Sequence, residues 1–291
     1  MRSSARTVSP TLDIRSNFRS VIAMSNSVDL YDNVYADFAS DAEAAVRRAT
    51  YGEDIGQSSW MTAAAWLRFA DLLQVRAESH ILEVGSGSGG PAVYLAAMRG
   101  CRITGVDINE HGIHNGERLA AKRGLADRVK FQKADAAKSL PFGPATFDAV
   151  ISNDAMCHIP NRLDVLCDWH CIVRPGGRIL FTDAMIVSGL VSHEELAIRS
   201  SIGFYLFVPP GENERLIARS GFRSLSSEDV TEDAAAIAQR WYEAREKHRA
   251  ALVEREGLAN FDGLQRFLAC VHSLSADRRL SRYCYLAERV S

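Results

Sequence analysis

The sequence predicts an α/β fold with a doubly wound, mostly parallel sheet. Three observations predict it: short runs rich in β-branched residues recur from residue 80 onward, segments with helical periodicity fill the gaps, and a glycine cluster follows the first run. Such alternation is typical of parallel sheets, because each crossover between parallel strands packs a helix on a sheet face. Helical patterns before the sheet and after residue 185 predict an N-terminal helical cover and a helical lid and insertion near the C-terminus.

Length, composition and charge restrict the partners. The chain has 291 residues, 47% of them hydrophobic, which suffices for a large core. The formal net charge of −2 gives no field that would hold a polyanion, so we expect a small-molecule partner and neither nucleic acid nor a membrane surface. No apolar run approaches the about 18 residues that a membrane span requires. We expect a cytoplasmic protein, and the sequence leaves a homodimer open.

The cysteines are spread along the chain without the dense spacing of a disulfide scaffold. They are Cys101, Cys157, Cys167, Cys171, Cys270 and Cys284. We expect reduced thiols in core positions. Cys167, His170 and Cys171 lie one helical turn apart, but no second pair completes a metal site, so no metal is expected.

The N-terminal region divides at Met24. The segment before it has four arginines and one aspartate, a composition shared by transit peptides and disordered extensions. We expect residues 1–24 to be a disordered extension or to reflect a misassigned start, with a targeting signal as the alternative. Residues 25–78 are expected to form the helical cover, because alanine-rich helical stretches flank the turn-like segment "YGEDIGQSSW".

Residues 79–230 contain the predicted sheet. Its strands in chain order are "HILEVG", "RITGVDI", "VKFQKAD", "FDAVISND" and "GGRILFTDA". A lid is expected over residues 185–210, where the aromatic segment "IGFYLFVPP" interrupts the alternation. A helix "ENERLIARSGF" and a strand "RSLSSEDVT" complete the region.

Residues 231–275 are expected to form a helical insertion. Thr231 to Leu258 is predicted as one long helix, with Thr231 as its N-cap and acidic residues in its first turn. A second helix is expected around Asp262 to Ser273. Residues 276–291 include "RYCYLAERV", which predicts a closing strand.

The glycine cluster is the first candidate site. Gly85, Gly87 and Gly90 match the G-x-G-x-x-G pattern after a strand, which nicotinamide and flavin enzymes share. Asp107 ends the second strand, where an acid can accept hydrogen bonds from ribose hydroxyls. Glu83 lies two residues before the first glycine, and its charge would oppose a pyrophosphate. A cationic cofactor suits this arrangement better.

Five motifs in this order resemble those of the class I S-adenosylmethionine-dependent methyltransferases. They are "EVGSGSGG", "GVDIN", "KADA", "FDAVISNDAMCHI" and "RPGGRILFTD", and they cover about residues 80–183. The resemblance implies a Rossmann-like sheet and S-adenosylmethionine as the cofactor. It assigns the methionyl part to the glycine loop, the ribose to the acid after the second strand and adenine to the acid after the third. The cofactor-binding residues that it implies are Glu83, Gly85, Gly87, Gly89, Asp107, Ile108, Asp135, Ala136 and Asn153.

The methyl acceptor is predicted from weaker signals. "YGEDIGQSSW" and "NDAMCHIP" resemble segments of the small-amine N-methyltransferases of the sarcosine/dimethylglycine and phosphoethanolamine type, in which the N-terminal segment closes the site. This favours an amine nitrogen as acceptor, with Gln57 and Ser58 at the carboxylate end of the cofactor. An O- or C-methyltransferase of natural-product or quinone biosynthesis is the main alternative, because the fold does not select the acceptor. A nicotinamide-dependent dehydrogenase and a non-catalytic cofactor-binding protein are more remote alternatives.

His158 is the candidate catalytic residue. It follows the fourth strand by about one helical turn, and an imidazole can take a proton near neutral pH. A histidine that only forms hydrogen bonds within the lid is the alternative. The phosphoethanolamine enzymes pair such a histidine with an N-terminal tyrosine, for which Tyr31 and Tyr35 are candidates here. The lid aromatics expected to cover the acceptor are Phe204, Tyr205 and Phe207.

Overall fold

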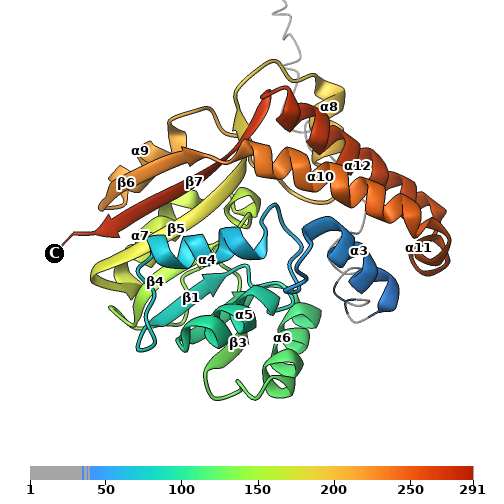
Figure 1. Ribbon diagram of the computed structural model, residues 1–291. Coiled ribbons are helices and arrows are strands. Elements are labelled where there is room, and N and C mark those ends of the chain that lie inside the picture. Colours follow the sequence, from blue (N-terminus) through green and yellow to red (C-terminus); the bar gives the residue numbers. More distant parts are fainter. Residues whose placement is uncertain (1–34, 36–37, 39, 291) are drawn as a thin grey trace, which may run out of the picture.

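A computed structural model describes residues 35, 38 and 40–290 of the chain. Within them the chain folds around a seven-stranded sheet with helices on both faces, which confirms the predicted α/β class (Figure 1). The strand order is β3-β2-β1-β4-β5-β7-β6. Tyr31 and the extension expected over residues 1–24 lie outside the described residues.

The first five strands are parallel, and the last two add an antiparallel edge. The parallel strands are β1 (His80–Val84), β2 (Arg102–Asp107), β3 (Val129–Lys133), β4 (Phe147–Ser152) and β5 (Val173–Val187). β7 (Leu280–Arg289) runs antiparallel between β5 and β6 (Phe222–Asp229). The strand order reverses between β1 and β4, and at such a switch point the loops leave a crevice at the carboxyl ends of the strands.

Two hydrophobic clusters cover the two faces of the sheet. Helices α4, α5 and α6 contribute to one cluster, and α7 and α9 contribute to the other. Their bounds are α4 (Ala63–Leu72), α5 (Gly90–Arg99), α6 (Glu110–Lys122), α7 (Arg162–Ile172) and α9 (Glu212–Arg219). Because both faces are covered, β1 and β4 are almost entirely buried and have no alternation of polar residues.

A third cluster joins the N-terminal and C-terminal helices, which lie far apart in the sequence. Figure 1 shows α10 and α12 running side by side, with α3 near α10 and α11 at their far end. The bounds are α3 (Asp41–Tyr51), α8 (His193–Arg199), α10 (Thr231–Lys247), α11 (Arg249–Glu256) and α12 (Leu258–Ala276). This cluster brings the predicted cover and the predicted insertion together.

The predicted long helix from Thr231 to Leu258 is wrong in three respects. It breaks at His248, which ends α10 and precedes α11, and the turn at Gly257 (φ 79°) starts α12 earlier than expected. Thr231 is not the N-cap. Instead, the Asp229 carboxylate accepts hydrogen bonds from the Thr231 N–H (2.9 Å) and hydroxyl (2.5 Å), so Asp229 caps the helix from the end of β6.

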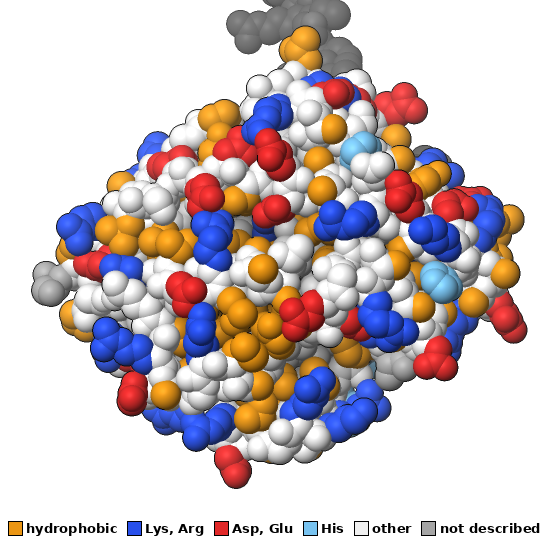
Figure 2. Space-filling view, viewed as in Figure 1, with side chains coloured by type: hydrophobic (Ala, Val, Ile, Leu, Met, Phe, Trp, Pro, Cys, Tyr) orange, Lys and Arg blue, Asp and Glu red, His pale blue; other side chains and the backbone are white. Residues whose placement is uncertain are grey.

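Two of the six cysteines do not occupy the expected core positions. Cys167 and Cys171 are exposed on α7, because its sheet-facing side is taken by Val165, Leu166, Trp169 and Ile172. No described helix is long and apolar enough to cross a membrane, and no three described His, Cys, Asp or Glu side chains are grouped so as to hold a metal ion. Figure 2 shows Lys and Arg side chains interspersed with Asp and Glu on the face in view.

Candidate active site

A cavity of about 400 Å³ lies at the carboxyl ends of β1, β2 and β4, where the strand order reverses. All the residues predicted to bind the cofactor or to act in catalysis line it, with one exception. The exception is Gly89, which packs inward instead. A Cβ there would lie 2.5 Å from the Phe131 ring and 2.6 Å from the Gly116 Cα, so this glycine allows α5, α6 and β3 to approach closely.

The glycine loop is held in a left-handed conformation that suits glycine. Gly85 has φ 76° and Gly87 has φ 52°. A Cβ on Gly85 would lie 2.3 Å from the Cβ of Ala155, and one on Gly87 would lie 2.8 Å from the Tyr35 hydroxyl. The loop therefore lies between the segment after β4 and an N-terminal tyrosine, with its backbone against the cavity.

Asp107 ties the glycine loop to the end of β2. Its carboxylate accepts hydrogen bonds from the N–H groups of Gly87 and Asn109, both at 2.8 Å. Burial raises the pKa of the Asp107 carboxyl, and these donors oppose that effect. Asp135 occupies the corresponding position after β3, where it accepts the Ala137 N–H (3.0 Å). Both acids line the cavity, as the assignment to ribose and adenine requires.

Glu83 is a buried acid without a hydrogen-bond partner for its Oε2 atom among the described residues. Burial, with the nearby charge of Asp107, raises its pKa well above the ordinary value. An ammonium group bound in the cavity would provide the missing partner and stabilise the ionised form. The orphaned oxygen, the glycine backbone and Asp107 together fit a cofactor that has both an ammonium and a ribose.

Tyr35 reaches the glycine loop from the N-terminal region. Its carbonyl accepts a hydrogen bond from Asn115 Nδ2 (2.6 Å), and its buried hydroxyl lies against Gly87. Burial raises the pKa of this phenol, and the carboxylates of Asp107 and Glu83 raise it further, so the hydroxyl stays protonated. The sequence suggested Tyr35 as a partner for His158, whereas the structure places it against the cofactor loop.

The loop between α3 and α4 covers the start of α5. A Cβ on Gly90 would lie 2.1 Å from the Ile55 carbonyl oxygen, so Gly90 is required for this approach. Gln57 lines the cavity, but its amide is occupied within the loop: Oε1 accepts the Ile55 N–H (2.9 Å), and Nε2 donates to the Glu53 carbonyl (3.1 Å). Its contact with the carboxylate end of the cofactor stays a prediction.

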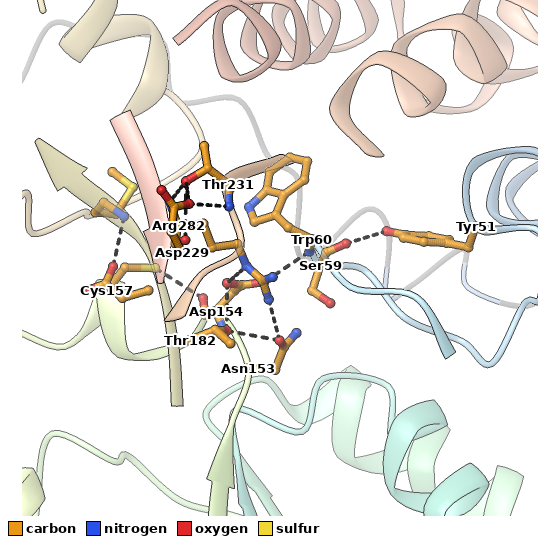
Figure 3. A network of polar contacts seen from close by, with 12 residues as sticks. Tyr51, Ser59, Trp60, Asn153, Asp154, Cys157, Thr182, Asp229, Thr231 and Arg282 are labelled. Carbon is orange, nitrogen blue, oxygen red and sulfur yellow. Dashed lines mark hydrogen bonds and ion pairs between the residues drawn. The ribbon is translucent and has the colours of Figure 1, made fainter. Parts of the chain in front are cut away.

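Asp154 is the centre of a polar network that the sequence analysis did not identify (Figure 3). It has φ 56°, and its Oδ1 accepts hydrogen bonds from Arg282 Nε (2.8 Å) and the Thr182 hydroxyl (2.9 Å). Its Oδ2 accepts from the Trp60 N–H and Arg282 Nη2, both at 3.1 Å. An arginine at the start of the apolar run "RYCYLA" was the one sequence signal for this contact.

His158 lies in the short 3-10 turn after β4 and lines the cavity. Its Nδ1 is 2.8 Å from the Phe204 carbonyl oxygen, which can only accept, so the proton is on Nδ1 and the lone pair is on Nε2. Burial lowers the pKa of the ring. The ring packs on Tyr205 with centroids 4.4 Å apart. The contact with the lid that was expected as an alternative therefore exists, and it fixes the tautomer that a base needs.

The far end of the cavity is mainly aromatic. The ring centroid of Trp60 lies 5.9 Å from that of Trp241 and 6.4 Å from that of Phe267. The guanidinium of the buried Arg199 lies over the rings of Tyr205 (4.4 Å) and Phe267 (5.0 Å). Trp241, Phe267 and Arg199 were not predicted, because nothing in a local pattern separates them from ordinary core residues.

The three predicted lid aromatics have different positions. Phe204 and Tyr205 line the cavity, and Phe204 is 56% exposed. Phe207 packs in a separate cluster with Met185 and Leu280 and does not line it.

Comparison with known proteins places this site in a family. Residues 82–181 match the model of a methyltransferase domain. The chain is 30% identical over 204 residues to the 27-O-demethylrifamycin SV methyltransferase of Amycolatopsis mediterranei, which covers 66% of this chain and 75% of that protein. It is 29% identical over 211 residues to the O-methyltransferase resE of Aspergillus sclerotiorum, covering 70% of this chain and 78% of that protein. Other relatives are named as sterol C-methyltransferases and a glycine/sarcosine/dimethylglycine N-methyltransferase.

Among solved structures, the phosphoethanolamine N-methyltransferase 2 of Haemonchus contortus, in complex with phosphomonomethylethanolamine and S-adenosylhomocysteine, superposes with a TM-score of 0.75. The match covers 90% of this chain and 60% of that chain at 21% sequence identity. At this identity the likeness shows the fold alone.

Proposed function

The chain belongs to the class I S-adenosylmethionine-dependent methyltransferases, and from that premise we propose that it methylates a hydroxyl oxygen of a largely apolar small molecule. S-adenosylmethionine is the cofactor of this family, and when bound it supplies an activated methyl group. The observation that carries the proposal is the charge of the acceptor end, the part of the cavity lined by Trp60, Arg199, Tyr205, Trp241 and Phe267.

The acceptor end has no carboxylate, among the described residues, that is available to an ammonium. Asp154 contacts this end through the Trp60 N–H, and its two oxygens already accept hydrogen bonds from Arg282, Thr182 and Trp60. Arg199 also lines this end, with its guanidinium over the rings of Tyr205 and Phe267. A cationic amine would leave water and find no available carboxylate among the described residues of this end, whereas a neutral hydroxyl needs none.

His158 would act as the base. The Phe204 carbonyl holds the proton on Nδ1, so Nε2 can accept the hydroxyl proton as the oxygen becomes nucleophilic. Because burial lowers the pKa of His158, the ring is neutral at neutral pH and its Nε2 lone pair is not protonated. The aromatic walls exclude water and hold the acceptor in line with the methyl group.

The sequence relatives with high coverage support an oxygen acceptor. One is named for its action on 27-O-demethylrifamycin SV and another as an O-methyltransferase, and this chain covers 75% and 78% of them. The glycine/sarcosine/dimethylglycine enzyme is covered over only 31% of its length.

An amine nitrogen, the acceptor favoured by the sequence analysis, is the second candidate. The rings of Trp60, Trp241 and Phe267 offer faces that attract a cationic amine. An amine that also bears a carboxylate or phosphate could place that anion near Arg199. The two candidates differ in the charge of the acceptor group: an amine enters the cavity as a cation, whereas a hydroxyl enters it neutral.

A panel assay separates the two candidates. We would measure S-adenosylhomocysteine release with phenols and enols of increasing size, and in parallel with sarcosine and phosphoethanolamine. Turnover confined to hydroxyl acceptors, with loss of activity in His158→Ala, supports the proposal. Turnover confined to the amines would replace it with the second candidate.

A further inference from the structure

Arg282 lies on the closing strand, at a register shift between β5 and β7. The pairing of β5 with β7 is regular up to Asp183 and Tyr283 and resumes at Ile186 and Ser281, so Arg282 stands where it is interrupted. Irregularities of this kind re-aim side chains and are frequent beside active sites. The Arg282 side chain is 1% exposed and points toward the segment that follows β4 (Figure 3).

The backbone of Arg282 is fixed as firmly as its side chain. Its N–H donates to the Thr231 hydroxyl (3.0 Å), and its carbonyl accepts the Val230 N–H (2.9 Å). Thr231 begins α10, the helix that contributes Trp241 to the cavity. The position of Arg282 is therefore linked to the insertion helices as well as to the sheet.

Arg282 also determines how Asn153 faces the cavity. Its Nη2 donates to Asn153 Oδ1 (2.8 Å), and the Thr182 hydroxyl shares its one proton between this oxygen (3.0 Å) and Asp154 Oδ1 (2.9 Å). Because the carbonyl oxygen of the amide accepts from Arg282, the Nδ2 group is the part of Asn153 that can meet a ligand. The cavity wall thus offers a donor at this point and not an acceptor.

The same guanidinium neutralises Asp154. Arg282 binds Asp154 through Nε and Nη2, and the pair is buried, with side chains 1% and 8% exposed. Asp154 in turn accepts the Trp60 N–H, which holds the cover loop against the acceptor end. Removal of Arg282 alone would leave an uncompensated carboxylate in the cavity wall.

We propose that Arg282 is a positioning residue that sets the charge preference of the acceptor end: it neutralises Asp154, orients the Asn153 amide and so leaves no carboxylate in the wall beside the transferred methyl group that would attract a cationic acceptor. This inference rests on the proposed function, because it concerns the same site. It identifies the acceptor class as neutral or anionic at the reacting atom, and it assigns that selectivity to a residue that does not line the cavity.

The test compares two ligands that differ in charge at the methyl position. Sinefungin carries an ammonium there, whereas S-adenosylhomocysteine is neutral. Calorimetry on the full chain gives the ratio of their dissociation constants for wild type, Arg282→Gln, Asp154→Asn and the double variant. Arg223→Gln is the matched control, because it removes an arginine from a mostly exposed ion pair with Glu288 on the neighbouring strand.

We expect Arg282→Gln to shift the ratio toward sinefungin by at least about tenfold, because one buried charge near the ligand is worth that much. Asp154→Asn should shift it in the opposite direction, and the double variant should restore the wild-type ratio. A merely structural role would weaken both ligands equally. If Arg282→Gln does not fold, Asp154→Asn provides the test. A shift of the ratio away from sinefungin supports the proposal, and an unchanged ratio or a shift toward sinefungin overturns it.

An unchanged ratio in both single variants, with tight binding of both ligands, would overturn this inference and leave the proposed function intact. Wild-type protein that binds neither ligand would contradict the proposed function and the inference with it.

Discussion

The two ends of the cavity are built in opposite ways. The cofactor end is formed by three segments close together in the sequence, residues 83–88, 106–109 and 134–137, and consists mainly of glycine backbone, serines and acids. The acceptor end takes its walls from the cover and from the lid and insertion, which follow the cover by more than a hundred residues, and it consists mainly of aromatic rings and an arginine.

This difference indicates how many substitutions each end of the cavity can tolerate. The cofactor end depends on backbone conformation and on acids placed directly after strands, so it tolerates few changes. The acceptor end depends on large side chains that arrive from different elements, so it can change its ligand without disturbing the cofactor. Substitutions at one end should therefore leave the ligand of the other end almost unaffected.

The largest effect is expected at the acceptor end, from His158→Ala. Loss of a general base typically lowers turnover by about 10²–10⁴. The affinity for S-adenosylhomocysteine should stay nearly the same, which calorimetry checks, and His111→Ala on the exposed side of α6 serves as control. Turnover at the wild-type rate would show that the histidine only holds the lid.

The pH dependence of the same variant sharpens the comparison. Burial lowers the pKa of His158 below its ordinary value of 6.5, so the wild-type ring stays neutral from neutral pH down to below 6.5. The turnover number should fall only as the pH drops through this lowered pKa, and this acid limb should flatten in His158→Ala. An acid limb above pH 6.5 in the wild type would contradict the assignment.

At the cofactor end, Gly85→Ala should cost about 2–5 kcal/mol of stability. About 1–2 kcal/mol comes from the left-handed backbone, and about 1–3 kcal/mol comes from the clash of the new Cβ with Ala155. Gly124→Ala is the matched control, because its φ is 66° and nothing lies within 4 Å of the added Cβ. Equal losses in chemical denaturation of the two variants would mean that the close approach to Ala155 is unimportant.

Asp107→Ala tests the cofactor end without adding an atom that could clash. Removal of a charge-assisted acceptor should weaken binding of S-adenosylhomocysteine by about 1.5–3 kcal/mol, measured by calorimetry. Asp127→Ala removes an exposed acid between α6 and β3 and should have no effect. An unchanged dissociation constant for the Asp107 variant would remove this residue from the site.

The smallest effect is expected from Trp241→Phe. The change keeps an aromatic wall, so the loss should stay below about 1.5 kcal/mol and should appear in the KM for the acceptor. Tyr242→Phe, at the next and more exposed position, is the control. If Trp241→Phe weakened cofactor binding as much as acceptor binding, the two ends would not be energetically independent.

Much of the cofactor end could be predicted from the sequence. The order of the strands along the chain, the glycine loop and the acids after β2 and β3 follow from short patterns, and Glu83, Asp107 and Asp135 all line the cavity. Gly89 was assigned to the ligand although it serves the packing of Phe131. A pattern of glycines does not reveal which of them faces the ligand and which allows two elements to meet.

The acceptor end could be predicted only in part. His158 was identified because it follows a strand, and Tyr205 because it lies in an aromatic lid. Arg199, Trp241 and Phe267 were not identified, since each is a common residue within an ordinary helical pattern. The break at His248 was missed for the same reason: no proline or glycine marks it.

The sequence by itself determined the fold class, the family and the cofactor end, because these depend on local conformation and on residues that follow one another in the chain. The tertiary structure alone decided the charge of the acceptor end. Arg282 stands 128 positions from Asp154, and the two meet only because β7 inserts antiparallel beside β5 with a register shift at that point. The pairing of distant strands is fixed by the packing of the whole sheet, so no local pattern could reveal it.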